Sequence, residues 1–237
     1  MANLSEHIHH IAFQAKQASR EIAKAGPEQK NAALHSLAEI LLKKKRSILE
    51  ANALDIAQAK KNDLSLPKID RLTIDEKLID NMADACRFIA GLPDPIGAMD
   101  KQWQRPNGLL VGKMRIPLGV IAMIYESRPN VTVDAAILCL KAGNSVILRG
   151  GSEAFHSNIL LAGLIQEALL QNGFCKEIVQ YIENTDRESI YELCKLSQFI
   201  DVIIPRGGEK MVQSIASRAT MPVLKHDKGV PHLFVDE

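Results

Sequence analysis

Two stretches of the sequence place an arginine and two glycines directly after an apolar run. They are SVILRGGSEA (145–154) and DVIIPRGGEK (201–210). Glycine lets the backbone approach a bulky anion, and arginine can bind a phosphate through two parallel hydrogen bonds. If a helix begins after each triplet, its free N–H groups add about 0.3 to 1 kcal/mol of attraction for negative charge. Two such corners in one sheet predict a ligand with separated anionic parts, such as a dinucleotide.

The Arg-Gly-Gly triplets also have simpler interpretations. Plain turn chemistry would account for the glycines without any ligand. Similar triplets occur in RNA-binding tails, but those tails have low-complexity surroundings, whereas these triplets follow apolar strands. Neither G-x-G-x-x-G nor G-x-x-x-x-G-K-[ST] occurs in the chain, so neither an ordinary Rossmann protein nor a P-loop enzyme is supported.

Helical periodicity dominates the amino-terminal part of the chain. Apolar residues recur at helical spacing over 4–25 and again over 28–60, where Pro27 suits the first turn of the second helix. A third helix is expected after Thr73-x-x-Glu76, a pattern typical of a capping box. Residues 1–92 are therefore predicted to form a helical layer.

Two further parts follow the helices. Prolines exclude a helix over 93–117, where GLLVGKMRI, after a Pro-Asn-Gly turn, favours a protruding strand or hairpin that could serve as an oligomer contact. Residues 118–237 then alternate between apolar strands and helical patterns. The expected strands are 119–125, 145–149, 177–182, 199–205, 222–225 and 232–236, and the helices are 131–142, 157–171, 187–196 and 209–218. This order predicts a doubly wound, mostly parallel α/β sheet within one nucleotide-binding domain, 1–237. Ligands of such sheets bind beyond the carboxyl ends of the strands, where both Arg-Gly-Gly triplets stand.

The overall charge excludes several partners. Basic and acidic residues number 29 and 28, so the net charge of +1 offers no field for nucleic acid or an anionic membrane. No apolar run approaches the roughly 20 residues that cross a bilayer, and the start does not resemble a signal peptide, so we expect a cytoplasmic protein. The four cysteines lack C-x-x-C spacing, so we expect reduced thiols and no metal site.

Longer motifs add a resemblance to a known family. The segments PLGVIAMIYESRPNVTVDAAILCLKAGNSVILRGGSEAFHSN, DVIIPRGG and MPVLKH…GVPHLFVDE resemble the gamma-glutamyl phosphate reductases, or glutamate-5-semialdehyde dehydrogenases, of the aldehyde dehydrogenase superfamily. The resemblance implies a homo-oligomeric enzyme of proline biosynthesis. Such an enzyme reduces the small molecule L-glutamyl 5-phosphate with NADPH to L-glutamate 5-semialdehyde and phosphate. The superfamily's dinucleotide domain also lacks G-x-G-x-x-G.

The same resemblance implies roles for individual residues. Arg149 would lie at the adenosine ribose, where its charge suits the 2′-phosphate of NADP. The same side would be lined by Gly150, Gly151, Ser152 and Glu153. The loop against the pyrophosphate would be formed by Arg206, Gly207 and Gly208. In YESRPN, either Ser127 or Asn130 would donate to the developing oxyanion, and Arg128 would meet a carboxylate or phosphate.

The resemblance also implies that part of the catalytic apparatus lies elsewhere. In the superfamily a cysteine thiolate attacks the acyl carbon, phosphate leaves, and hydride then reduces the thioester. That cysteine is expected beyond Glu237, so we expect the chain to be inactive alone. Its own thiols are predicted to be buried or incidental: Cys86, Cys139, Cys175 and Cys194. Pro231 stands where many relatives have a cysteine, and His226 is either a substrate contact or a surface residue.

Two alternatives remain open at this stage. One is a dehydrogenase of another semialdehyde or acyl phosphate, for which Arg128 favours an anionic substrate. The other is a non-catalytic nucleotide-binding or scaffold protein that ends naturally at Glu237. A reading frame that continues into a cysteine-bearing loop would favour the enzyme, and a stop codon would favour the scaffold.

Overall fold

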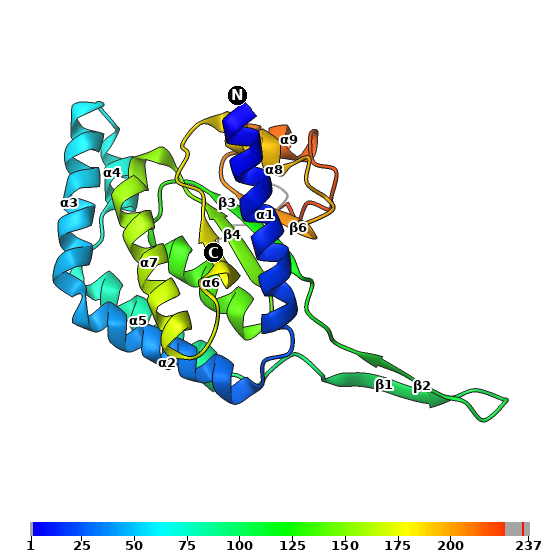
Figure 1. The fold of residues 1–237 in the computed structure, drawn as a ribbon. Coiled ribbons are helices and arrows are strands. Elements are labelled where there is room, and N and C mark those ends of the chain that lie inside the picture. The colour runs from blue at the N-terminus through cyan, green and yellow to red at the C-terminus, as the bar shows by residue number, and fades with distance from the viewer. Residues whose placement is uncertain (1, 226–233, 235–237) are drawn as a thin grey trace.

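The computed structural model describes residues 2–225 and residue 234. A four-stranded parallel sheet lies between two layers of helices, and a two-stranded hairpin extends from this body (Figure 1). The sheet strands are β3 (Val120–Tyr125), β4 (Ser145–Arg149), β5 (Val179–Tyr181) and β6 (Val202–Arg206). The predicted doubly wound α/β fold is confirmed.

The order of the sheet, β5-β4-β3-β6, reverses beside β3. From β3 the chain passes through α6 (Asn130–Lys141) to β4 and through α7 (Phe155–Gln171) to β5. It then returns through α8 (Arg187–Leu193) to β6 on the other side of β3, and α9 (Glu209–Ala216) follows. The carboxyl ends of β3 and β6 therefore border the crevice at which open α/β sheets bind ligands.

Alternation along the strands supplies both faces of the sheet with apolar side chains. In β3, Val120, Ala122 and Ile124 pack in one core with α1 (Ala2–Ile22), α8 and α9. Ile121 and Tyr125 of the same strand pack in the other core with α6 and α7. Because successive side chains of a strand point to opposite faces, one apolar run serves both layers.

The amino-terminal helices divide between the two faces. The amino-terminal part of α1 covers the face shared with α8, while α2 (Pro27–Lys43) and α5 (Glu76–Gly91) pack outside α6 and α7. The single helix expected over 28–60 is wrong. The helix ends at Lys44, whose φ of −101° and ψ of 15° leave the helical region, and α3 (Lys45–Lys61) begins after it. Apolar periodicity continues through the break, so the sequence pattern does not reveal it.

The expected capping box before α5 is also wrong. Asp75 is the N-cap, and its carboxylate accepts a hydrogen bond from the Leu78 N–H at 2.7 Å. Thr73 Oγ1 instead donates to the Ile69 carbonyl at the end of α4 (Leu66–Leu72), a helix that the sequence pattern did not predict.

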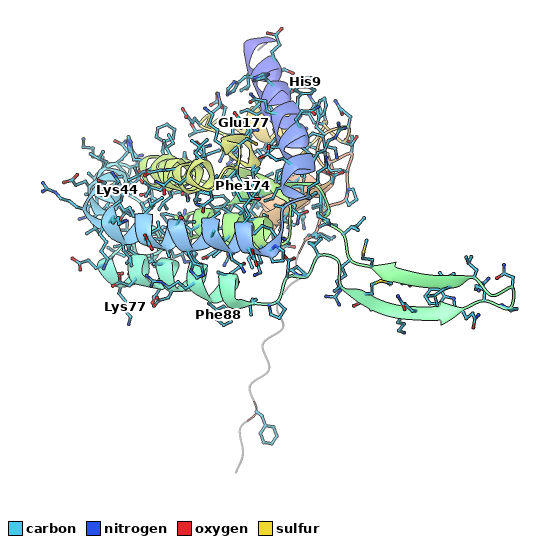
Figure 2. All side chains as sticks on the ribbon, turned by 60° about the horizontal axis from the view of Figure 1, so that its bottom comes forward. His9, Lys44, Lys77, Phe88, Phe174 and Glu177 are labelled. Atoms are coloured by element: carbon cyan, nitrogen blue, oxygen red, sulfur yellow. The ribbon has the colours of Figure 1, made fainter. Side chains whose placement is uncertain are left out.

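The hairpin consists of β1 (Met99–Gln104) and β2 (Leu110–Met114), paired antiparallel. Figure 2 shows its side chains projecting on both sides, clear of the body of the molecule. At its base, Lys30 Nζ lies 2.6 Å from Asp94 Oδ2, and both side chains are largely buried. Lys141 Nζ donates to Asn31 Oδ1 and to the Ala90 carbonyl nearby. This polar cluster ties α2, α5 and α6 to the start of the hairpin.

The structure tests the predictions for the carboxyl-terminal segment only in part. The strand expected at 222–225 is reduced to an isolated parallel bridge between Val223 and Ile203. The strand expected at 232–236, together with His226 and Pro231, lies outside the described residues apart from residue 234. Within the part that is described, no helix is both long enough and apolar enough to span a bilayer.

Candidate functional site

A cleft of about 760 Å³ lies at the point where the sheet order reverses. In the parallel register, Tyr125 at the end of β3 pairs with Arg206 at the end of β6. The cleft is lined by Arg71, Met123, Glu126, Ser127, Arg128, Val131, Ile204, Pro205, Arg206, Gly207, Gly208 and Leu224. Its position is the one predicted for a ligand of this sheet.

The second Arg-Gly-Gly corner opens directly into this cleft. The Gly208 N–H, at the N-cap of α9, donates to Glu126 Oε2 at 3.0 Å. A Cβ at Gly207 would lie 2.6 Å from Glu126 Cδ, so glycine lets the carboxylate approach the backbone. The amide before α9 thus already binds a carboxylate, which shows that this helix start accepts anionic oxygen.

The first Arg-Gly-Gly corner differs in its helix start. The N–H groups of His156 and Ser157 donate to the Asp55 carboxylate at 2.9 and 2.8 Å, and Ser157 Oγ donates to it at 2.6 Å. Asp55 belongs to α3 and is buried. The expectation of free amides after this corner is therefore wrong, because a carboxylate from a distant helix occupies them.

Arg149 is enclosed at the end of β4. Only 7% of the residue is exposed, and its guanidinium donates to the Gly150 carbonyl at 2.7 Å and to the Thr185 carbonyl. Nε has no hydrogen-bond partner among the described residues. Burial lowers the pKa of Arg149, against the opposing effect of Tyr181, Glu153 and Asp186. The residue lies at the predicted rim, but it does not line the cleft.

Ser127 joins the loop after β3 to the first corner. Glu153 Oε1, from the first corner, accepts from the Ser127 N–H at 2.9 Å and from Ser127 Oγ at 2.6 Å. Ser127 has a φ of +48°, in the left-handed region that costs a non-glycine residue about 1 to 2 kcal/mol. The two hydrogen bonds help to hold this conformation. Gly151 packs against the same carboxylate, while Ser152 is exposed in the 3₁₀ turn Ser152–Ala154.

Asn130 and Arg128, the other two candidates in YESRPN, differ in how many of their hydrogen-bond donors are free to bind a ligand. Asn130 Nδ2 donates to Asp134 Oδ2 at 2.9 Å, so part of its donor capacity is used within α6. Burial raises the pKa of Asp134, although that hydrogen bond opposes the shift. Arg128 is exposed, lines the cleft and has no ion-pair partner among the described residues.

Two charged residues of the cleft were missed by the sequence analysis. Glu126 stands beside Ser127, but no assigned motif gave it a role. Arg71 comes from α4, in a stretch read only as a connection between helices. Recognition of that stretch as a helix would have placed an arginine in its last turn, but its proximity to residues 126–131 depends on the tertiary fold.

The four thiols lie away from the cleft. Burial raises the pKa of Cys86 and Cys139 to about 12 and that of Cys175 and Cys194 to about 11. Thiols with such values are poor nucleophiles at neutral pH. Among the described residues, no group of three or more His, Cys, Asp or Glu side chains could hold a metal ion.

Comparison with known proteins gives the class. The model of the aldehyde dehydrogenase family matches residues 2–227. The chain belongs to the aldehyde dehydrogenase family, and this membership implies a nicotinamide cofactor. A probable aldehyde dehydrogenase from Listeria monocytogenes, at 17% identity and a TM-score of 0.73, shares the fold.

More specific likeness is to the gamma-glutamyl phosphate reductases. The relative from Oleidesulfovibrio alaskensis is 57% identical over 235 residues, which are 99% of this chain and 56% of that protein. The crystal structure of the Thermotoga maritima enzyme has a TM-score of 0.89 at 39% identity, covering 92% of this chain and 52% of that one. The crystal structure of the Saccharomyces cerevisiae enzyme has a TM-score of 0.86 at 28% identity, and the match covers 94% of this chain and 56% of that one. The chain thus spans about half the length of the curated relatives that it matches.

Proposed function

We propose that this chain is the cofactor-binding part of an enzyme that reduces L-glutamyl 5-phosphate with NADPH, giving L-glutamate 5-semialdehyde and phosphate in proline biosynthesis. The observation that carries the proposal is 57% identity to a gamma-glutamyl phosphate reductase over 99% of the chain. The arginine-lined cleft supports it, because both the cofactor and an acyl phosphate are anionic.

The residues present fit a dinucleotide. The amide of Gly208 and the exposed guanidinium of Arg206 would bind the pyrophosphate, and Gly207 would keep side chains away from it. The first corner would bind the adenosine part of the cofactor, through Arg149, Gly150, Gly151, Ser152 and Glu153. The cofactor supplies hydride when bound. Its 2′-phosphate would need Arg149 to turn a guanidinium N–H outward, since two of its nitrogens now bind carbonyls.

The loop after β3 would serve the acyl group. Ser127 and Asn130 are the candidate donors to an oxyanion, and Arg128 would bind a carboxylate or phosphate. For Ser127 to donate through Oγ, its 2.6 Å hydrogen bond to Glu153 must open. Asn130 keeps a second amide hydrogen that Asp134 does not use. The attacking thiolate would come from outside these residues, because the raised pKa values of the four thiols oppose that role.

Assembly and location form part of the same proposal. Large apolar side chains stand exposed on the hairpin, among them Met99, Trp103, Leu109, Leu110 and Met114. Such side chains on an isolated two-stranded ribbon favour burial against another protein surface, and we assign them to a homo-oligomer contact. All four cysteines are free, which fits a reducing, cytoplasmic compartment.

Calorimetric titration of the purified chain with NADPH and NADH tests the proposal. We expect NADPH to bind more tightly, and Arg206→Gln to weaken NADPH binding about tenfold through loss of a charged contact. Arg20→Gln, which removes the same charge from α1 outside the cleft, should leave affinity unchanged. NADPH oxidation with L-glutamyl 5-phosphate should be absent for the chain alone. Failure of the wild-type chain to bind NADPH, or normal turnover by it, would contradict the proposal.

A further inference from the structure

Arg71 is a third arginine at the cleft. It lines the cleft with Arg128 and Arg206, and none of the three has an ion-pair partner among the described residues. The one carboxylate in the lining is Glu126, which binds the Gly208 amide. Three arginines against one glutamate leave an excess of positive charge, and exposed arginines brought together repel one another unless an anion lies between them.

A buried asparagine fixes the segment that carries Arg71. Asn52 of α3 is 1% exposed, and its Nδ2 donates to the Leu72 carbonyl at 2.9 Å. Its Oδ1 accepts from the Ile74 N–H at 2.8 Å. Leu72 itself is fully buried and packs with Ala59 and Ala154. Hydrogen bonds on both sides of Thr73, together with the Leu72 anchor, hold the backbone beside Arg71 in one place.

The helix dipole gives only a weak reason for the position of Arg71. Arg71 is the cation in the last turn of α4, where a helix attracts positive charge, but α4 has only seven residues. Lys68 is an exposed cation of the same helix that does not line the cleft. Arg71 differs from Lys68 in that it lines the cleft, together with Arg128 and Val131.

The face of the sheet from which Arg71 reaches the cleft indicates which ligand it binds. α3 and α4 pack on the face of the sheet that carries α6 and α7. The Gly207–Gly208 backbone leads into α9, whose Ile215 packs in the core of the opposite face. Arg71 therefore reaches the cleft from the face of the sheet opposite to the one that α9 covers. Under the proposed function, the amides at the start of α9 take the cofactor's pyrophosphate, which leaves Arg71 and Arg128 for the substrate.

We propose that Arg71 is a specificity-determining residue that binds an oxyanion of the acidic substrate, either its carboxylate or its phosphoryl group. The proposal rests on the proposed function, since that function supplies the anionic substrate. Arg71 acts with Arg128 as a pair of guanidinium groups from two separate elements. Two such groups select a ligand that carries negative charge at a set distance from the cofactor.

The test is titration of the 237-residue chain with inorganic phosphate, with L-glutamate and with NADPH, each in a separate experiment. Binding is measured by calorimetry or by ³¹P and ¹⁵N NMR. Arg71→Gln should weaken binding of phosphate or of L-glutamate by about tenfold and leave the NADPH dissociation constant within about twofold. A loss of phosphate binding in Arg71→Gln would identify the phosphoryl group as the part of the substrate that Arg71 binds. A loss of L-glutamate binding would identify the carboxylate instead. Arg71→Lys should restore part of the affinity, and Lys68→Gln is the matched control that should change none of the three.

Unchanged binding of both anions in Arg71→Gln would overturn the inference, and so would a loss confined to NADPH. Absence of any phosphate or L-glutamate binding by the wild-type chain would overturn it as well. If the wild-type chain binds phosphate but not NADPH, the proposed function fails, while the Arg71→Gln comparison with phosphate still decides this inference.

Discussion

Glu126 accepts a hydrogen bond from the Gly208 N–H at 3.0 Å, across 82 residues of sequence. This contact joins the loop after β3 to the start of α9 at the reversal of the sheet order. The carboxylate stands where the proposed function requires a phosphate. A ligand phosphate that uses the Gly208 amide must therefore displace the side chain of Glu126.

Substitution of Glu126 should tighten cofactor binding. Glu126→Gln removes the negative charge and weakens the internal hydrogen bond, so we expect the NADPH dissociation constant to fall by about three- to tenfold. Titration calorimetry would measure this change. Glu188→Gln, which removes an equal charge from α8 outside the cleft, is the control and should have little effect. Weaker or unchanged binding in Glu126→Gln would show that Glu126 does not compete with the ligand.

Asp55 should be a strong determinant of stability. Asp55→Ala leaves three donors of α7 without their acceptor inside the protein, and we expect the free energy of unfolding to fall by about 3 kcal/mol. Urea unfolding followed by circular dichroism would measure it. Asp75→Ala removes an exposed cap of α5 and should cost only about 1 kcal/mol. Equal losses in the two variants would mean that burial of the Asp55 cap adds nothing.

The glycines of the two corners should respond differently to alanine. A Cβ at Gly150 would lie 2.2 Å from Nδ2 of the buried Asn158 and 3.1 Å from Tyr125 Cε2, so Gly150→Ala should cost about 2 kcal/mol. At Gly208, φ is −63° and nothing lies within 4 Å of a Cβ. Gly208→Ala should therefore leave the free energy of unfolding unchanged or raise it by up to about 1 kcal/mol. Thermal and urea unfolding of both variants would check the contrast, and a stable Gly150→Ala protein would refute it.

The Asp94–Lys30 pair at the base of the hairpin should make stability depend on pH. Burial opposes ionisation of Asp94, but the ion pair with Lys30 and the hydrogen bond from the Ile96 N–H lower its pKa overall. A carboxyl whose pKa is lower in the folded than in the unfolded state contributes stability above its unfolded pKa of about 3.9. That contribution is lost as the pH falls through the folded pKa.

Asp94→Asn should cost about 3 kcal/mol near neutral pH, because Lys30 is then buried without its counter-ion. The difference from wild type should shrink below about pH 4. Asp100→Asn breaks an exposed pair with Arg115 on the hairpin and should leave the free energy of unfolding almost unchanged, because solvent screens exposed pairs. Unfolding measured across pH would test both, and a pH-independent difference would argue against ionised Asp94 as the source.

The native thiols should react slowly with a disulfide reagent. With pKa values of about 11 to 12 for all four, only about a thousandth or less of each is thiolate at about pH 8. Cys175 is the least buried and should react first. In urea all four should react rapidly, which provides the control. A thiol that reacts rapidly in the folded protein would reveal a nucleophile that the structure does not indicate.

Local sequence patterns were sufficient for the α/β core. The runs 119–125 and 145–149 are apolar on both faces, so they predict buried parallel strands, and the glycines and prolines beside them mark the turns. They also place each Arg-Gly-Gly triplet at a strand end, as observed in β4 and β6. The break at Lys44 and the cap at Asp75 were not predicted, because continued apolar periodicity conceals the first and an alternative motif at Thr73 conceals the second.

The sequence by itself determined the alternation of strands and helices and the position of the two Arg-Gly-Gly corners, because these depend on side-chain period and on glycine's local freedom. The tertiary structure alone decided how the corners differ. Asp55 binds the helix start at the first corner from 102 residues away, while at the second corner Glu126 binds the Gly208 amide at the edge of a cleft that Arg71 also lines. Hydrogen bonds and charges act through space, so which amide meets which carboxylate depends on how the layers pack.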